Sequence, residues 1–334
     1  MGAATSVFEA PPTGLAQSIL GIIRRNGWAL GLVAFLALLL AFTRFIQPTY
    51  GERGIQGLAI SVLPLALAAV AQAVIVISGG IDLSVGSIMA LTSVVAATAM
   101  KGQSEEFAVA IVVGVLVLGL LIGAINGALV VFTRVPDIIV TLAMAFVWAG
   151  PALLLLPRPG GGSADWLKDL VIGSVGSDWI PKAALVLIAI VAVVWIPIQR
   201  SRLGLWMYAI GSNQLAAYRS GVSVGRTKIM AYAITGLFSA FGGLTLVASS
   251  GIASPVPGPY TLLSVAAIVL GGVSLAGGRG GVFGPVVAVV ILTLIGVDMT
   301  FLKVNPNLAT VAQGAILVGV VMFGTLLQYW RTRE

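Results

Sequence analysis

The sequence predicts an all-α, polytopic membrane protein with about ten transmembrane helices. Of its 334 residues, 59% are hydrophobic and only 9% are charged, and the mean hydropathy is +1.09. Soluble domains carry about 25% charged residues, so this composition is typical of a membrane protein. A helix needs about 20 residues to cross the hydrocarbon core. On that length the expected spans lie near residues 28–42, 58–77, 83–100, 107–132, 138–156, 183–198, 229–249, 261–276, 284–302 and 308–328.

Residues 58–100 form one apolar run that is too long for a single crossing, so the chain must turn within it. The segment 78–87 reads Ser-Gly-Gly-Ile-Asp-Leu-Ser-Val-Gly-Ser. Its pair Gly79-Gly80 is where a helix breaks most readily, because glycine costs a helix interior stability and accepts unusual backbone angles. We therefore predict a broken helix at 78–87, between the second and third spans.

Asp82 is the one ionisable residue between Gly54 and Met100. A carboxylate at membrane depth costs roughly 2.5–3.5 kcal/mol unless it has partners or faces a wet cavity. Asp and Ser are favourable N-caps, so we expect Asp82 or Ser84 to cap the third span close to water, at the inner end of the membrane. Direct contact with a transported substrate is the alternative, and the two roles can coexist.

The basic residues predict the orientation of the chain. With the N-terminus inside, eleven of the 18 Lys and Arg residues fall in inner segments and seven in outer ones, as the positive-inside rule requires. Both termini are then cytoplasmic. We expect a cytoplasmic tail at 1–23, a single transmembrane domain at 24–330 and a second cytoplasmic tail at 331–334. The net charge of +7 is thus a sign of topology, and we expect no binding of nucleic acid.

The composition also narrows the chemistry. The chain has no His and no Cys, which excludes thiol nucleophiles, His general bases and Cys/His metal sites. It contains no Gly-x-x-x-x-Gly-Lys-Ser/Thr motif, so it has no nucleotide-binding loop of that kind. We therefore expect no catalytic residues, no metal site and no cofactor on this chain.

A second glycine-rich segment resembles the first. Both 79–86 and 271–278 read Gly-Gly-aliphatic-polar-Leu-x-x-Gly and follow an apolar span. Internal repeats with broken helices mark the transport path in many transporters, although short patterns also recur by chance among 42 glycines. The residues that we expect at helix breaks or along a path are Gly79, Gly80, Asp82, Ser84, Asn126, Gly271, Gly272 and Ser274.

The polar segment 199–228 is the longest basic one, and it contains a predicted short helix at about 213–221. Asn213 is a favourable N-cap and Gly221 a favourable residue just after the helix end. Isolated helices below about 12–15 residues are marginal in water, so this one needs support. The support is either a partner protein or the membrane surface, where nearby Arg and Lys side chains could bind anionic lipid headgroups.

Five stretches carry a resemblance to a known family. They are the motif at 78–87, Gly-Ala-Ile-Asn-Gly at 123–127, Val-Pro-Asp-Ile-Ile-Val-Thr-Leu at 135–142, the Gly-Ser-Asn…Ala-Ala…Ser-Gly pattern of 211–221, and Ala-Ile-Val-Leu-Gly-Gly-Val-Ser-Leu-Ala-Gly-Gly-Arg-Gly at 267–280. In this order they resemble the permease subunits of bacterial ATP-binding-cassette sugar importers of the ribose, xylose, arabinose and galactofuranose type. The resemblance covers about residues 55–325.

The resemblance implies an inner-membrane subunit that moves a monosaccharide or similar polyol by alternating access. It implies a second permease subunit, identical or paralogous, and a periplasmic sugar-binding protein. ATP and Mg would be bound by a separate cytoplasmic ATPase. The 213–221 helix then resembles the coupling helix that docks on that ATPase. Its implied coupling residues are Asn213, Ala216, Ala217, Arg219, Ser220 and Gly221.

Two stretches depart from the family pattern. The loop that often reads Pro-Phe-Ile reads Pro136-Asp137-Ile138 here, and Asp298 stands in the ninth span, where an Asn-Gly-Leu-like stretch is usual. The second departure suggests one half of a pair of different permeases. The alternatives are a permease for branched-chain amino acids or nucleosides, and an ion-coupled secondary transporter. The latter needs membrane carboxylates, for which Asp82 and Asp298 qualify.

Overall fold

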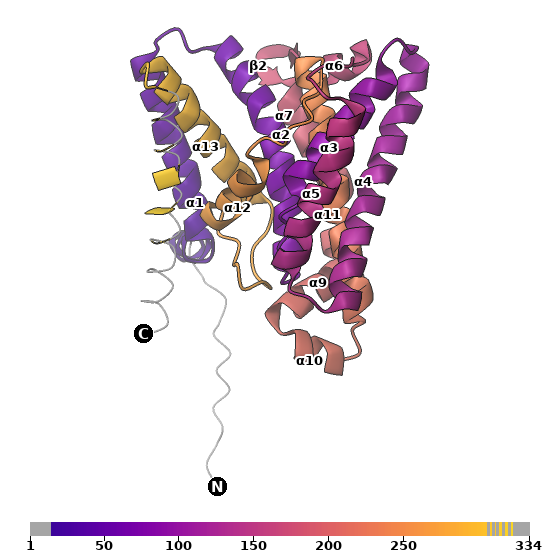
Figure 1. The fold of residues 1–334 in the computed structure, drawn as a ribbon. Helices are drawn as coiled ribbons and strands as arrows, with labels where there is room; N and C mark the ends of the chain where they lie inside the picture. Colours follow the sequence, from indigo (N-terminus) through magenta and orange to yellow (C-terminus); the bar gives the residue numbers. More distant parts are fainter. Residues whose placement is uncertain are drawn as a thin grey trace.

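The computed structural model describes the backbone of residues 15–305 and of seven further positions between 308 and 322, and the side chains of these residues from residue 27 onward. The predicted span at 308–328 lies outside the continuously described residues, as do the tail at 331–334 and residues 1–14. The described part is almost entirely helical (Figure 1). Its elements are α1 (Leu15–Ile46), α2 (Glu52–Ile77), α3 (Val85–Met100), α4 (Glu105–Thr133), α5 (Asp137–Leu155), α6 (Asp165–Val171), β1 (Ser174–Val175), β2 (Ser177–Pro181), α7 (Lys182–Ile190), the π-helix η1 (Val191–Trp195), α8 (Ile196–Arg200), α9 (Arg202–Ser212), α10 (Gln214–Arg219), α11 (Val224–Ser250), α12 (Tyr260–Leu270) and α13 (Phe283–Phe301).

Seven helices of the described part are long and apolar enough to cross a membrane, and α3 and α12 are shorter apolar helices. The polytopic, helical architecture is therefore confirmed. Two boundaries differ from the prediction. Helix α1 begins at Leu15, inside the segment predicted as a tail, and α12 stops at Leu270, because Gly271 and Gly272 end it well before the predicted 276.

Helix α2 is the central helix of the molecule (Figure 1). Its most apolar stretch is 89% buried inside the protein, and it packs against α3, α7, α11, α12 and α13. An apolar helix with no polar face is suited to this position, since every side can be covered by a neighbour. The break at its end is thus placed at the middle of the fold.

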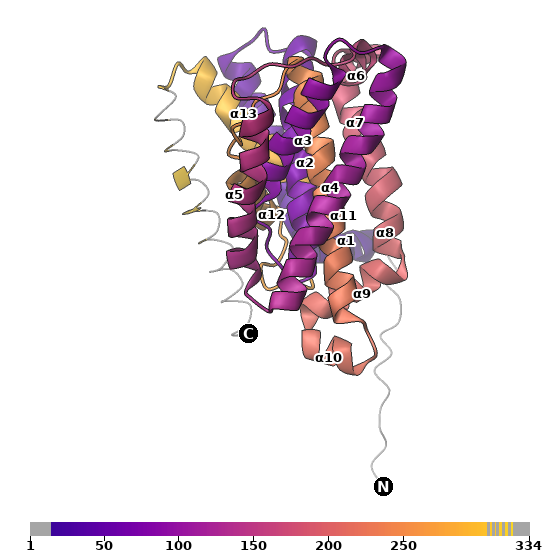
Figure 2. The same ribbon diagram turned by 45° about the vertical axis from the view of Figure 1, so that its right-hand side comes forward.

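Helices α4 and α11 lie side by side (Figures 1 and 2) and form the most extensive helix pair. Gly119, Gly123 and Gly127 follow each other at every fourth position of α4, so they line one face. A Cβ atom on Gly123 would overlap the backbone carbonyl of Tyr232 on α11. Small residues at this spacing let two membrane helices approach closely and pack backbone against backbone. The pair gives the fold a rigid wall beside the break.

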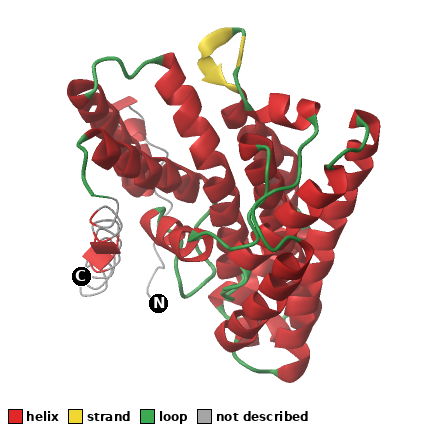
Figure 3. Cartoon of the chain, turned by 45° about the horizontal axis from the view of Figure 1, so that its top comes forward, coloured by secondary structure: helices red, strands yellow, loops and turns green. Residues whose placement is uncertain are grey.

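Between the predicted spans at 138–156 and 183–198 the structure has α6 and a small hairpin, β1 and β2, drawn in yellow in Figure 3. The hairpin is a correction to the all-α prediction. Its strands pair antiparallel at Ser174–Pro181 and Val175–Ser177, and Gly176 at the turn has φ of 70°. The hairpin packs on α2 at the upper end of the molecule in Figure 1.

The segment 199–228 also holds more structure than expected. Helix α9 precedes the short α10, and Ser201 caps α9 by accepting a hydrogen bond from the Gly204 amide (3.4 Å). We did not predict α9, because the apolar stretch 203–210 is too short to cross a membrane. In Figure 1 α9 leads from the helical body down to α10, which forms the lowest point of the labelled elements.

Candidate functional site

Helix α2 ends in a Schellman motif, which confirms the predicted break. The Gly80 amide donates to the Ile75 carbonyl (3.0 Å) and the Gly79 amide donates to the Val76 carbonyl (2.9 Å). Gly79 has φ of 79°, a left-handed conformation that costs residues with a Cβ atom about 1–2 kcal/mol. We call residues 78–84, between α2 and α3, the first break.

Four side chains tie the first break to its neighbours, and we call them the polar network. Asp82 Oδ1 accepts hydrogen bonds from the Ser84 amide (2.8 Å) and the Ser84 hydroxyl (2.6 Å). The amide of Asn126, on α4, donates to Ser84 Oγ (2.7 Å), and Trp148 Nε1, on α5, donates to Asn126 Oδ1 (3.0 Å). Each of these four hydrogen bonds pairs one donor with one acceptor, so all four can form at the same time.

The polar network corrects the expected role of Asp82. Ser84 occupies the N-cap position of α3, but its side chain makes no capping hydrogen bond there. Asp82, Ser84 and Asn126 are each fully buried, so the carboxylate is not close to water in this conformation. Asp82 Oδ2 has no hydrogen-bond partner among the described residues. Asp298, the other predicted membrane acid, is buried on α13.

Helix α12 ends in the same way as α2. The Gly272 amide donates to the Val269 carbonyl (3.0 Å), the Val273 amide donates to the Ile268 carbonyl (2.9 Å), and Gly272 has φ of 82°. This geometry matches Gly79 with Gly272, one residue away from the sequence pairing of Gly79 with Gly271. We call residues 271–282, between α12 and α13, the second break.

Ser274 of the second break is no counterpart of Asp82. It is half-buried, and its amide donates to the Arg279 carbonyl (3.1 Å). The described part of the chain shows no hydrogen bond from its hydroxyl comparable to that of Ser84. The two segments therefore share a helix ending but not a polar network.

The two breaks meet at a backbone contact with the end of α9. The Gly278 amide donates to the Ile77 carbonyl (3.0 Å). A Cβ atom on Gly211 would overlap that same carbonyl oxygen, and one on Gly277 would lie 2.9 Å from the Gly211 carbonyl oxygen. We call the four glycines at this contact the glycine junction; they are Gly79, Gly211, Gly277 and Gly278.

Tyr208 adds a second contact between α9 and the second break. Its hydroxyl donates to the Gly280 carbonyl (2.8 Å) and accepts from Gln199 Nε2 (3.3 Å). Burial raises the pKa of the Tyr208 hydroxyl above its usual value, so the proton needed for this bond is retained at neutral pH. Helix α9 is thus held to both breaks.

The caps of α10 are those that the sequence predicted. Asn213 Oδ1 accepts from the Ala216 amide (2.9 Å), and Gly221, with φ of 83°, follows the helix end. The Gly221 amide donates to Tyr218 and the Val222 amide to Ala217, both at 3.0 Å, which is a third Schellman motif.

The surface of α10 is unevenly apolar. Leu215 and Tyr218 are exposed, at 58% and 68% of their surface, and Arg219 is exposed beside them. Ala217, at 5%, faces the body of the protein. Of the residues implied for coupling, Asn213, Ala216, Arg219, Ser220 and Gly221 are exposed and Ala217 is not.

One acidic residue near the first break was not recognised as a site residue. Asp137, the first residue of α5, accepts a hydrogen bond through Oδ2 from the Tyr232 hydroxyl (2.9 Å), and Lys228 Nζ lies 3.9 Å from the same oxygen. The sequence marked Asp137 only as a departure from a family pattern. An acid in the first turn of a helix is ordinarily explained by the helix dipole, so no local signal pointed to these partners.

Comparison with known proteins gives the family. The family described as "Branched-chain amino acid transport system / permease component" matches residues 54–321. The chain belongs to this permease family. It is 32% identical to the galactose/methyl galactoside import permease protein MglC of Escherichia coli (strain K12), over 89% of this chain and 94% of that protein.

Two further relatives of this permease are also named as sugar permeases. It is 32% identical to the ribose import permease protein RbsC of Escherichia coli (strain K12), over 77% of this chain and 81% of that protein. It is 31% identical to the D-allose transport system permease protein AlsC of the same strain, over 75% and 77%. No solved structure matches the chain. The permease is thus a transport subunit and not an enzyme, and a multi-pass protein of the bacterial inner membrane, as predicted.

Proposed function

We propose that this permease forms part of an ATP-driven importer that moves a monosaccharide or similar polyol across the inner membrane by alternating access. The named substrates of its relatives, galactose, ribose and allose, support a sugar. The observation that carries the mechanism is the glycine junction, which joins the α9–α10 unit directly to both helix breaks.

The coupling step follows from this connection. Helix α10 docks on a separate cytoplasmic ATPase through its exposed face, formed by Leu215, Tyr218 and Arg219. ATP and Mg are bound by that partner. A shift of α10 moves α9, and α9 moves the breaks. The reason is that Gly211 packs directly on the backbone of Ile77 and Gly278, and Tyr208 is hydrogen-bonded to Gly280. Close-packed contacts of this kind transmit displacement rather than absorb it.

The polar network supplies groups suited to a path for sugars. Sugars bear hydroxyl groups and no charge, so they are recognised by a few hydroxyl, amide and carboxylate groups among apolar walls. Asp82, Ser84 and Asn126 are such groups, and in this conformation they bond to one another. They support the first break here and become available to substrate when the break opens. Gly79, Gly80, Gly271, Gly272 and Ser274 provide the backbone of the breaks.

In the proposed importer this permease has ten spans, with both termini in the cytoplasm. It pairs with a second permease subunit, either identical or paralogous, and a periplasmic sugar-binding protein delivers the substrate. Membrane lipid surrounds the permease. The single domain at 24–330 carries all ten spans, and the ends at 1–23 and 331–334 are cytoplasmic.

Reconstitution of the permease with the ATPase and binding protein encoded beside it tests the function. Uptake of labelled ribose, galactose and allose is measured with and without ATP inside the vesicles, with leucine and a nucleoside as competitors. We expect ATP-dependent uptake of a sugar. Uptake of leucine instead, or uptake that continues without the ATPase, would contradict the proposal.

Arg219→Glu tests the docking face of α10. The substitution places a negative charge on an exposed position that the fold does not use, so we expect normal membrane insertion and a stability change within about 0.5 kcal/mol. Uptake should fall, and ATPase activity should no longer respond to the loaded binding protein. Arg158→Glu, on the loop between α5 and α6, is the matched control; equal effects in both variants would argue against docking through α10.

A further inference from the structure

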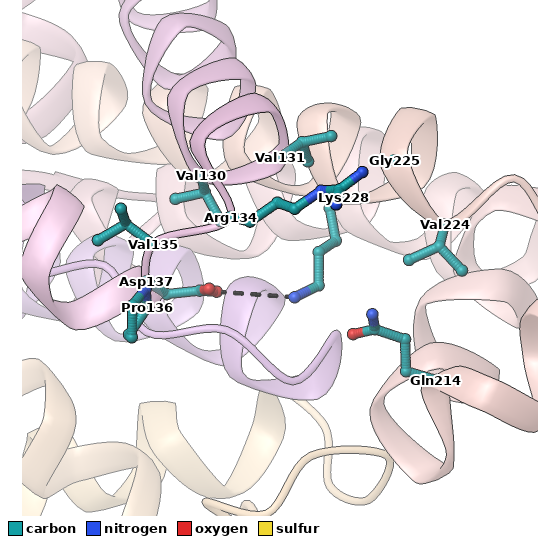
Figure 4. Close-up of a pocket in the computed structure, with 10 residues that line it drawn as sticks. All are labelled: Val130, Val131, Arg134, Val135, Pro136, Asp137, Gln214, Val224, Gly225 and Lys228. Atoms are coloured by element: carbon teal, nitrogen blue, oxygen red, sulfur yellow. Dashed lines mark ion pairs between the residues drawn. The ribbon is translucent and has the colours of Figure 1, made fainter.

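A cavity of about 500 Å³ lies between the lower ends of α4 and α5 and the beginning of α10 and α11 (Figure 4). Four valines and four polar residues line it, together with Pro136 and Gly225. Arg134 follows the end of α4, and Asp137 is the first residue of α5. Gln214 is the first residue of α10, and Lys228 lies in the first turns of α11. The cavity is therefore bordered both by the coupling helix and by the start of α5.

Asp137 joins the start of α5 to α11 beside this cavity. Its Oδ2 accepts the Tyr232 hydroxyl at 2.9 Å and faces Lys228 Nζ at 3.9 Å, the ion pair drawn as a dashed line in Figure 4. Only 19% of the Asp137 side chain and 15% of the Lys228 side chain are accessible. A pair this enclosed is little screened by solvent, so its attraction counts more than that of a surface pair.

The same carboxylate touches the first break. A Cβ atom on Gly80 would lie 2.7 Å from Asp137 Oδ2, so the acid is packed directly on the backbone of the break. One turn later, Thr141 Oγ1 accepts a hydrogen bond from the Leu83 amide (3.0 Å). The first turn of α5 thus supports the break on both sides of Asp82.

Of the two contacts that Asp137 Oδ2 makes with α11, the one with Lys228 is the longer. At 3.9 Å the ammonium group is near enough for attraction but beyond a direct hydrogen bond, whereas the Tyr232 contact is a full hydrogen bond. Lys228 stands shortly after α10 in the chain, and Gln214 of α10 lines the same cavity. A displacement of α10 therefore changes the Lys228–Asp137 separation more readily than the Tyr232–Asp137 contact.

We propose that Asp137, Tyr232 and Lys228 form a latch that holds the first break in its present conformation and opens when the coupling helix moves. The glycine junction connects the α9–α10 unit to the end of α2 through backbone contacts. The latch connects α11 to Gly80 of the first break through Asp137. These residues are positioning residues, since they act on the break and need not touch the substrate. The proposal rests on the proposed function for its consequence in transport, but the latch itself is a property of this chain.

The test measures the latch by distance and by coupling. The chain has no Cys, so spin labels can be placed at Ile138→Cys on α5 and Met230→Cys on α11, both exposed. The distance between them is measured by pulsed electron resonance in nanodiscs, for the full chain alone and in the complex with and without ATP. We expect Asp137→Asn and Lys228→Met to shift the distribution of the chain alone towards the one that ATP produces in the complex. In the same variants, the ATP hydrolysed per molecule transported should rise about fivefold, the lower end of the change expected when a coupling free energy is lost.

Two controls separate a latch from a merely structural pair. The pair Asp169–Lys182, at 2.7 Å with an exposed carboxylate and far from the first break, is neutralised in the same way and should change neither readout. Tyr232→Phe keeps the ring but removes the hydrogen bond to Asp137, so it should shift the distances in the same direction as the two charge variants. Unchanged distances in Asp137→Asn and Lys228→Met, or an equal shift in the Asp169–Lys182 control, would overturn the latch. A distance shift without sugar transport in any complex would leave the latch standing and remove the proposed function.

Discussion

The two breaks share a helix ending but are held in place by different means. At the first break, Asp82 and Ser84 are buried and bonded through Asn126 to α4 and through Trp148 to α5. At the second, Gly272 is exposed, and the ending is held by backbone bonds and by Trp28, whose indole nitrogen donates to the Leu270 carbonyl (2.9 Å). The same backbone geometry is therefore fixed by side chains in one place and largely by backbone in the other.

This difference predicts different sensitivities. Removing one partner of a buried hydrogen bond lowers the free energy of unfolding by about 1–3 kcal/mol, because the remaining polar group stays buried without a partner. A half-exposed group can turn to water instead. The first break should therefore respond to the loss of a single polar side chain, and the second mainly to changes that alter backbone contacts.

The largest effect is expected where the breaks touch. Gly211→Ala places a Cβ atom against the Ile77 carbonyl oxygen, so backbone has to move, and we expect a loss of about 3 kcal/mol or more in the free energy of unfolding. Gly57→Ala, on α2 with no atom within 4 Å of the added carbon, should be neutral or slightly stabilising. Unfolding in mixed micelles at increasing SDS concentration measures both. Equal stabilities would show that the glycine junction is loosely packed.

The next largest effect belongs to the polar network. Asn126→Leu leaves the Trp148 indole N–H without its acceptor and Ser84 Oγ without a donor, so we expect a loss of about 2 kcal/mol. The double variant Asn126→Leu/Trp148→Phe removes both partners of one bond and should recover part of this loss. The same unfolding measurement applies. A double variant no more stable than Asn126→Leu alone would mean that the indole bond contributes little.

Some of this site could be predicted from residues alone. The break at Gly79-Gly80 followed from span length and glycine, and the caps Asn213 and Gly221 followed from local preference; each depends on neighbours in the chain. The polar network did not follow, because Asn126 and Trp148 are far from Ser84 in the sequence. Single Asn and Trp residues occur in many membrane helices without such a bond.

Other features depend on packing that no local pattern reveals. The one-residue offset between Gly79 and Gly272 appears only in the hydrogen bonds, since both segments offer two glycines in a row. Tyr232 and Lys228 carry no signal of a shared partner, because their meeting with Asp137 depends on how α5 and α11 pack. The burial of Asp82 was mispredicted for the same reason: the length of the spans indicated an inner end, and neighbouring helices cover it.

A smaller effect is expected at Trp28. Trp28→Phe keeps the ring but removes the hydrogen bond to the Leu270 carbonyl, and a typical bond of this kind contributes about 1 kcal/mol. Because 42% of the Trp28 side chain is exposed, the freed carbonyl can find water or headgroup partners, so the loss should not exceed that value. Unfolding in micelles gives the number, and a loss as large as that of Asn126→Leu would remove the contrast between the breaks.

The smallest effect is expected at Ser274, and it separates the two segments most directly. If the sequence pattern of 79–86 and 271–278 reflected equal roles, Ser274→Ala would resemble a loss at Asp82 or Ser84. In the structure the Ser274 amide, which Ala retains, makes the bond to Arg279, and the half-buried side chain is dispensable. We expect a change within about 0.5 kcal/mol for Ser274→Ala, against about 1–3 kcal/mol for Ser84→Ala, which leaves Asn126 without its acceptor. Measured side by side in micelles, equal losses would mean that the second break also depends on a side-chain bond.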